Sequence, residues 1–124
     1  MKDSAYMHIF AQSMWHDEAV IVANLQGLIA LRKAIDDAIN TGSGFSMSFA
    51  GDGEGFNTLV GRVEDSLFDG LAYPYTDEIA SEKRDDPVWP HMIPSVKEAQ
   101  TQALAELERK YPTPKRDAND TSGT

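Results

Sequence analysis

The run from Leu25 to Asn40 repeats its apolar residues at the spacing of an α-helix, and this pattern constrains the fold most. Its apolar face would contain Leu28, Leu31, Ile35, Ala38 and Ile39, and its opposite face Arg32, Lys33, Asp36 and Asp37. Asn24 is a favourable N-cap, and Gly42 is placed to end the helix in the left-handed conformation. The sequence therefore predicts one amphipathic helix that buries a single face.

Four shorter runs have the composition or alternation of β-strands: Tyr6–Gln12, Ala19–Ala23, Phe45–Ala50 and Phe56–Val63. In the third run, Phe45, Met47 and Phe49 share one face because successive side chains of a strand alternate. We expect an α+β fold in which a mainly antiparallel four-stranded sheet carries the helix on one face. In that arrangement Ile35 and Phe49 meet across the helix–sheet interface.

Prolines interrupt any long regular element between Ser66 and Pro94. The large apolar side chains of this segment predict that it packs over the sheet as a cover. A second helix is expected from Ser95, which forms a capping-box pattern with Glu98, to about Lys110. The covering segment and this helix are also candidates for a contact between copies of the chain.

The length and composition predict one folded domain over residues 1–111 and a disordered tail over 112–124. The chain has no cysteine, which excludes disulfides, thiolate metal sites and cysteine nucleophiles. It also has neither an apolar run long enough to span a bilayer nor a signal-peptide pattern, so we expect a cytoplasmic protein. No cofactor is predicted.

The formal net charge of −9 disfavours binding to nucleic acid and to anionic membranes, and favours basic protein surfaces. The segment Glu64–Asp86 contains eight acidic residues and only two basic ones, Lys83 and Arg84. Its acidic residues include Asp77, Glu78, Asp85 and Asp86. This segment is either a solvated loop or a docking surface for a basic partner.

Aromatic side chains lie within the same acidic segment, in the stretch "YPYTDE" from Tyr73 to Glu78. Tyr73 and Tyr75 are rigid rings of the kind that anchor interfaces, and Thr76 could cap a helical turn. Arg62 and Arg84 are the candidates for holding an anion, although both could simply balance nearby acids. The stretch is therefore a candidate contact for a partner or a ligand.

The glycine-rich stretch "GDGEG", which begins at Gly51, lies between two predicted strands, where a hairpin turn is expected. It lacks the lysine and hydroxyl residue of a phosphate-binding loop and carries Asp52 and Glu54 instead. A recognition loop with Phe56 at its edge and a weak metal contact through the two acids are the alternatives. The turn is the preferred interpretation.

The stretch "WHDE" places His16 and Glu18 on the same side of an extended chain. They are weak candidates for metal ligands, as are Asp52 and Glu54, because a catalytic metal usually takes three protein ligands. A surface turn is the alternative. A small metal-dependent hydrolase is accordingly one of the functions considered.

The runs "HDEAVIVANLQGLIALRKAIDDAI", "FAGDGEGFNTLVGRV" and "LAYPYTDEIA" resemble small bacterial and phage proteins of the immunity or anti-defence type. The resemblance covers about Met7 to Ala80. It implies a toxin-immunity or anti-defence role. Together with the acidic Glu64–Asp86 segment, it predicts a non-catalytic protein that neutralises a basic toxin or defence protein by occupying it.

A protein that sequesters a small nucleotide-like immune signal is the alternative to an inhibitor of a protein. Its pocket would use Phe56, Tyr73 and Tyr75 for stacking, and Arg62 or Arg84 for phosphate.

Overall fold

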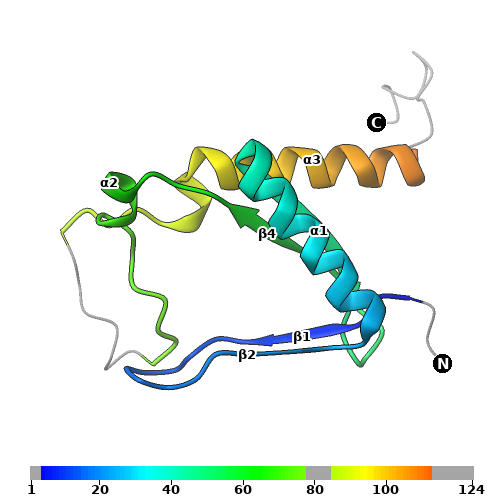
Figure 1. The fold of residues 1–124 in the computed structure, drawn as a ribbon, viewed down its shortest axis with the longest axis horizontal. Coiled ribbons are helices and arrows are strands. Elements are labelled where there is room, and N and C mark those ends of the chain that lie inside the picture. Colours follow the sequence, from blue (N-terminus) through cyan, green and yellow to red (C-terminus); the bar gives the residue numbers. More distant parts are fainter. Residues whose placement is uncertain (1–3, 78–84, 113–124) are drawn as a thin grey trace, which may run out of the picture.

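The computed structural model describes residues 4–77 and 85–112 and shows an α+β fold, as the sequence predicts (Figure 1). In chain order its elements are β1 (Met7–Phe10), β2 (Val20–Ala23), α1 (Leu25–Thr41), β3 (Ser43–Phe49), β4 (Gly55–Gly61), α2 (Asp65–Phe68), the 3-10 helix η1 (Pro90–Met92) and α3 (Pro94–Lys110). None of the described helices is long and apolar enough to cross a membrane. The tail predicted from residue 112 lies outside the described residues, apart from Pro112 itself.

The four strands form two antiparallel hairpins, β1–β2 and β3–β4, so the prediction of one four-stranded sheet is wrong. The hairpins meet at a corner, where Phe49 N–H donates to the carbonyl of Ala5 at 2.8 Å, Tyr6 forms a single bridge with Phe49, and His8 Nε2 accepts from Gly51 N–H at 2.8 Å. Beyond this corner the β1–β2 hairpin extends away from β3–β4 and α3 (Figure 1).

Asn24 ties the residue before β1 to the start of α1. Its side-chain Oδ1 accepts hydrogen bonds from the backbone N–H of Gly27, at 2.9 Å, and of Tyr6, at 3.0 Å. Its own N–H donates to the carbonyl of Tyr6 at 3.1 Å. Both backbone groups of Tyr6 are therefore satisfied by the helix N-cap residue, on the side of the chain that faces β2. The predicted N-cap is confirmed and also joins the β1–β2 hairpin to the start of α1.

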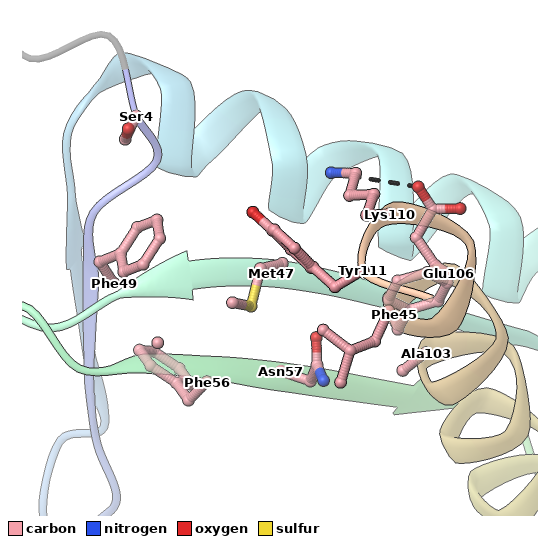
Figure 2. A pocket seen from close by; sticks show the side chains of 12 residues that line it. Ser4, Phe45, Met47, Phe49, Phe56, Asn57, Ala103, Glu106, Lys110 and Tyr111 are labelled. Atoms are coloured by element: carbon pink, nitrogen blue, oxygen red, sulfur yellow. Dashed lines mark ion pairs between the residues drawn. The ribbon is translucent and has the colours of Figure 1, made fainter. Parts of the chain in front are cut away.

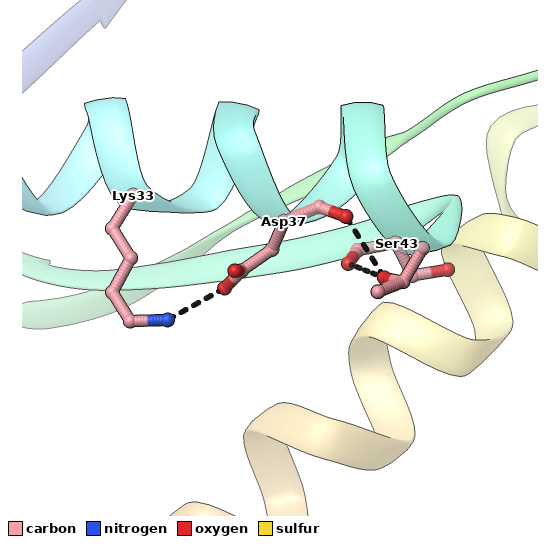
Figure 3. A network of polar contacts seen from close by, with 4 residues as sticks. Lys33, Asp37 and Ser43 are labelled. Carbon is pink, nitrogen blue, oxygen red and sulfur yellow. Dashed lines mark hydrogen bonds and ion pairs between the residues drawn. The ribbon is translucent and has the colours of Figure 1, made fainter.

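At the other end of α1, Gly42 adopts the predicted left-handed conformation, with φ of 101°. Its N–H donates to the carbonyl of Ala38 at 2.9 Å, and β3 begins at the next residue. Thr41 Oγ1 donates to the carbonyl of Asp37 at 2.8 Å, and Lys33 forms an ion pair with the Asp37 side chain at 2.8 Å (Figure 3). A single glycine therefore joins helix and strand, and α1 lies directly against β3.

The face of α1 that is buried consists of small residues. Gly27, Ala34 and Ala38 are buried, whereas Leu28, Ile35 and Ile39 are exposed. A Cβ atom added to Gly44 of β3 would lie 2.1 Å from the carbonyl oxygen of Ala34, which shows how closely the two backbones approach. Ile35, at 43% exposure, does not anchor this interface, so the predicted pairing of Ile35 with Phe49 is wrong.

The second helix, α3, covers the β3–β4 hairpin with another small-residue face, where Ala99 and Ala103 are buried. It begins at Pro94 with Ile93 as its N-cap, one residue before the predicted start, so Ser95 is not the cap. Ser43 Oγ instead donates to the carbonyl of Ser95 at 2.6 Å and ties β3 to the first turn of α3.

Because α1 and β3 lie so close together, Gly44 is the glycine at which an added methyl group should destabilise the protein most. We expect Gly44→Ala to lower the free energy of unfolding by about 1–3 kcal/mol or more, because the added methyl would overlap the backbone of Ala34. Gly70→Ala is the matched control, since its nearest neighbour would lie at an ordinary 3.6 Å. Urea unfolding curves measure both. Equal losses in the two variants would contradict the close contact.

Candidate functional site

Two ends of the acidic segment come together through a short backbone bridge. The N–H of Ala72 donates to the carbonyl of Val88, and the N–H of Val88 donates to the carbonyl of Gly70, both at 2.8 Å. Because α2 precedes this bridge by two residues, the bridge brings α2 close to the chain around Asp85 and Asp86 (Figure 1). Acids from both ends of the segment therefore belong to one region.

Four carboxylates of this region, those of Glu64, Asp65, Asp85 and Asp86, are exposed. None of the four forms an ion pair with another described residue. Like charges held close together in solvent produce a negative potential that extends beyond the surface by about one Debye length. The region is therefore suited to attract a positively charged surface.

Two large aromatic rings are exposed beside these acids. Phe68, the last residue of α2, is 63% exposed, and Trp89, which follows the bridge at Val88, is 48% exposed. The prediction that this segment packs its apolar residues over the sheet is therefore wrong for both rings. We call the region the acidic aromatic surface; it comprises Glu64, Asp65, Phe68, Asp85, Asp86 and Trp89.

Sequence reasoning did not select Phe68 and Trp89 as site residues. Both are large apolar residues, and that property alone predicts that they pack over the sheet. Their sequence neighbours could have indicated exposure: Phe68 lies in a run of acidic residues, and Trp89 lies between Pro87 and Pro90. Short segments of this kind rarely bury a large ring completely.

The other residues predicted for partner contact are distributed more widely. The rings of Tyr73 and Tyr75 lie 6.2 Å apart, and Thr76 is exposed. Asp77 is half-buried, and its N–H donates to the carbonyl of Ser13 at 2.8 Å, so this stretch contacts the tip region of the β1–β2 hairpin. Glu78 and Arg84 lie outside the described residues.

Arg62 is held at the end of α1. Its Nη1 donates to the carbonyl of Ile39, and its N–H donates to the carbonyl of Gly42 at 2.9 Å. A guanidinium near a helix C-terminus compensates unpaired carbonyl groups and the negative end of the helix dipole. The structure therefore shows a helix-capping contact for this residue.

The four weak metal candidates, His16, Glu18, Asp52 and Glu54, are all exposed. Among the described residues no three histidine or acidic side chains converge closely enough to hold a metal ion. Asp52 Oδ1 instead accepts from Glu54 N–H at 3.0 Å within the "GDGEG" stretch, and Gly53 adopts φ of 90°. This stretch is the hairpin turn between β3 and β4, as preferred from the sequence.

Phe56 lies in a second candidate site, a cleft of about 440 Å³ between the β3–β4 hairpin and the end of α3 (Figure 2). Its walls include the aromatic side chains of Phe45, Phe49, Phe56 and Tyr111. Asn57, Glu106 and Lys110 add polar groups at its edge. Tyr73, Tyr75 and Arg62 do not line this cleft, so the structure does not assemble the predicted stacking pocket here.

The edge of the cleft carries an ion-pair cluster on α3. Arg109 donates two hydrogen bonds to the carboxylate of Glu106, and Lys110 Nζ lies 4.0 Å from the same group. The hydrogen bond from Arg109 lowers the pKa of the Glu106 carboxyl; partial desolvation opposes this effect, and the charges of Arg109 and Lys110 add to it. The cleft therefore keeps an ionised carboxylate beside its lysine.

Comparisons with known proteins do not place the chain in a family: no family model, no curated protein and no solved structure matches it.

A titration tests the ion-pair cluster. We expect Arg109→Met to raise the pKa of Glu106 toward its ordinary value, as followed by NMR of the side-chain carboxyl carbon. The stabilisation from the pair is present above the ordinary glutamate pKa and is lost as the pH falls through the lowered pKa. Arg32→Met serves as the control and leaves Glu106 unchanged. An identical titration in all three proteins would rule out the interaction.

Proposed function

We propose that this protein is a non-catalytic binding protein that neutralises a basic protein partner by occupying it, in the manner of toxin-immunity and anti-defence proteins. One observation carries the proposal: the acidic aromatic surface combines exposed aromatic rings with exposed carboxylates that form no ion pair with another described residue. We place this interaction in the cytoplasm, in keeping with the expectation from the sequence.

The two kinds of side chain have different roles in such a contact. Phe68 and Trp89 are large, have few rotatable bonds and present apolar area, which are properties of the residues that dominate binding energy. Charges around such rings mainly accelerate association and reject partners of the same sign. The carboxylates would therefore select a basic partner and repel nucleic acid, while the rings hold the bound partner.

The aromatic cleft supports a second candidate function, the sequestration of a small nucleotide-like signal. A cleft of about 440 Å³ is within the range of small-molecule sites, and a base could stack on Phe56 or Tyr111. Lys110 is the cation that lines this cleft and could meet a phosphate, although Glu106 lies beside it. The carboxylate disfavours an anionic ligand, so protein binding is the preferred proposal.

Capture experiments with variants test the preferred function. The purified chain is used as bait on extract from the producing cell, and mass spectrometry identifies a retained protein. Replacing Glu64, Asp65, Asp85 and Asp86 with the corresponding amides should slow association at least roughly tenfold at low salt. Phe68→Ala or Trp89→Ala should instead speed dissociation by roughly tenfold or more.

The matched control neutralises four exposed acids elsewhere, namely Asp36, Asp52, Glu54 and Glu98. It makes the same change in net charge, so it separates a local surface from the general field of an acidic protein. Equal effects of the two charge variants would refute the acidic aromatic surface as the binding site. A native mass spectrum with a bound mass of several hundred daltons, lost in Phe56→Ala, would favour the second function.

A further inference from the structure

Two ranges of the chain, separated by the exposed loop residues His16, Asp17 and Glu18, have no charged side chains, in a protein whose composition is 25% charged. Residues 4–15 and 19–31, which include both strands of the β1–β2 hairpin and the first turns of α1, contain no Asp, Glu, Lys or Arg. We call these two ranges the charge-free region. The acidic aromatic surface lies outside it in the sequence.

Large hydrophobic side chains are exposed throughout the charge-free region. They are Ile9, Phe10, Trp15, Val20, Ile21, Val22, Leu25, Leu28 and Ile29. On the hairpin they occupy both faces, because the paired residues Ile9 and Ile21 point to one face and the paired residues Phe10 and Val20 to the other. Soluble monomers rarely leave so much contiguous apolar surface open to water.

In the described part of the chain, β2 is also paired with another strand along only one of its two edges. Its composition, "VIVA", is that of a central strand with two covered faces. In the described part of the chain, however, β2 pairs only with β1, so its second edge has no strand beside it. A two-stranded hairpin alone is marginally stable in water, and an uncovered edge is a template for another strand.

We infer that a second copy of this chain covers the charge-free region, forming a symmetric dimer with the two β2 strands close to the twofold axis. Two copies that each carry a charge of −9 repel each other, and this region is where they can meet without placing acids together. The surface also suits its own copy, because each partner offers a free strand edge and apolar side chains.

The exposed apolar area of the charge-free region is large enough for a dimer interface. At about half exposure, side chains of this size each present on the order of 100 Å². Counted over both faces of the hairpin and the first turns of α1, the nine residues together present an area comparable with the roughly 800 Å² per partner that a stable interface needs. The same region has no carboxylate to attract the basic protein of the proposed function, so the two contacts use different residues.

Sedimentation equilibrium of the full chain at micromolar concentration tests the inference. The wild-type protein is expected to be a dimer, and Val22→Lys is expected to weaken dimerisation by at least about 100-fold, because symmetry brings the two new charges close together. Leu104→Lys is the matched control: both side chains are 59% exposed, but Leu104 lies on α3 and its variant should stay a dimer. Circular dichroism checks the fold of both variants.

A cross-linking experiment keeps the inference testable if Val22→Lys does not fold. The chain has no cysteine, so any disulfide formed by a single introduced cysteine joins two copies. Mild oxidation should link Val22→Cys into a covalent dimer and leave Leu104→Cys largely monomeric. A monomeric wild-type protein, equal cross-linking of the two variants, or a monomer that floats with neutral lipid vesicles would each overturn the inference.

Discussion

The close contact between Gly44 and Ala34 determines how the rest of the molecule is arranged. Because Gly44 has no Cβ atom, the backbone of α1 approaches β3 closely at Ala34, and Ala38 is buried on the same face. Leu28, Ile35 and Ile39 lie on the exposed side of α1. Their exposure follows from this packing, and the proposed dimer would cover part of the exposed apolar surface.

The bonds of Asn24 add a second constraint with a functional consequence. Its amide joins the start of α1 to Tyr6, and the β1–β2 hairpin extends from this junction away from β3–β4 (Figure 1). The chain becomes an open frame rather than a closed sandwich of sheet and helices (Figure 1). In this frame the charge-free region and the acidic aromatic surface use separate residues. The proposed dimer contact and the proposed partner contact therefore do not compete for the same residues.

The sequence predicted local structure well and long-range arrangement poorly. Asn24 and Gly42 define the ends of α1 because caps depend on a few adjacent residues, and the glycine-rich turn followed from its own chemistry. The predicted buried face of α1 was right for Ala38 and wrong for Leu28, Ile35 and Ile39, because hydrophobicity favours burying large residues whereas close backbone contact requires alanine and glycine. The acidic aromatic surface depends on the bridge at Val88, which joins residues 17 positions apart and leaves no periodic signal.

The central claim is that α1 buries its small face and presents its large one, and thiol labelling tests this claim most directly. A single cysteine can be placed at Ile35 or at Ala38, since the chain has none of its own. The account predicts that the Ile35→Cys thiol reacts in the native protein nearly as fast as in urea. The Ala38→Cys thiol should react only when the protein unfolds. Rapid labelling at 38 with protection at 35 would contradict the account.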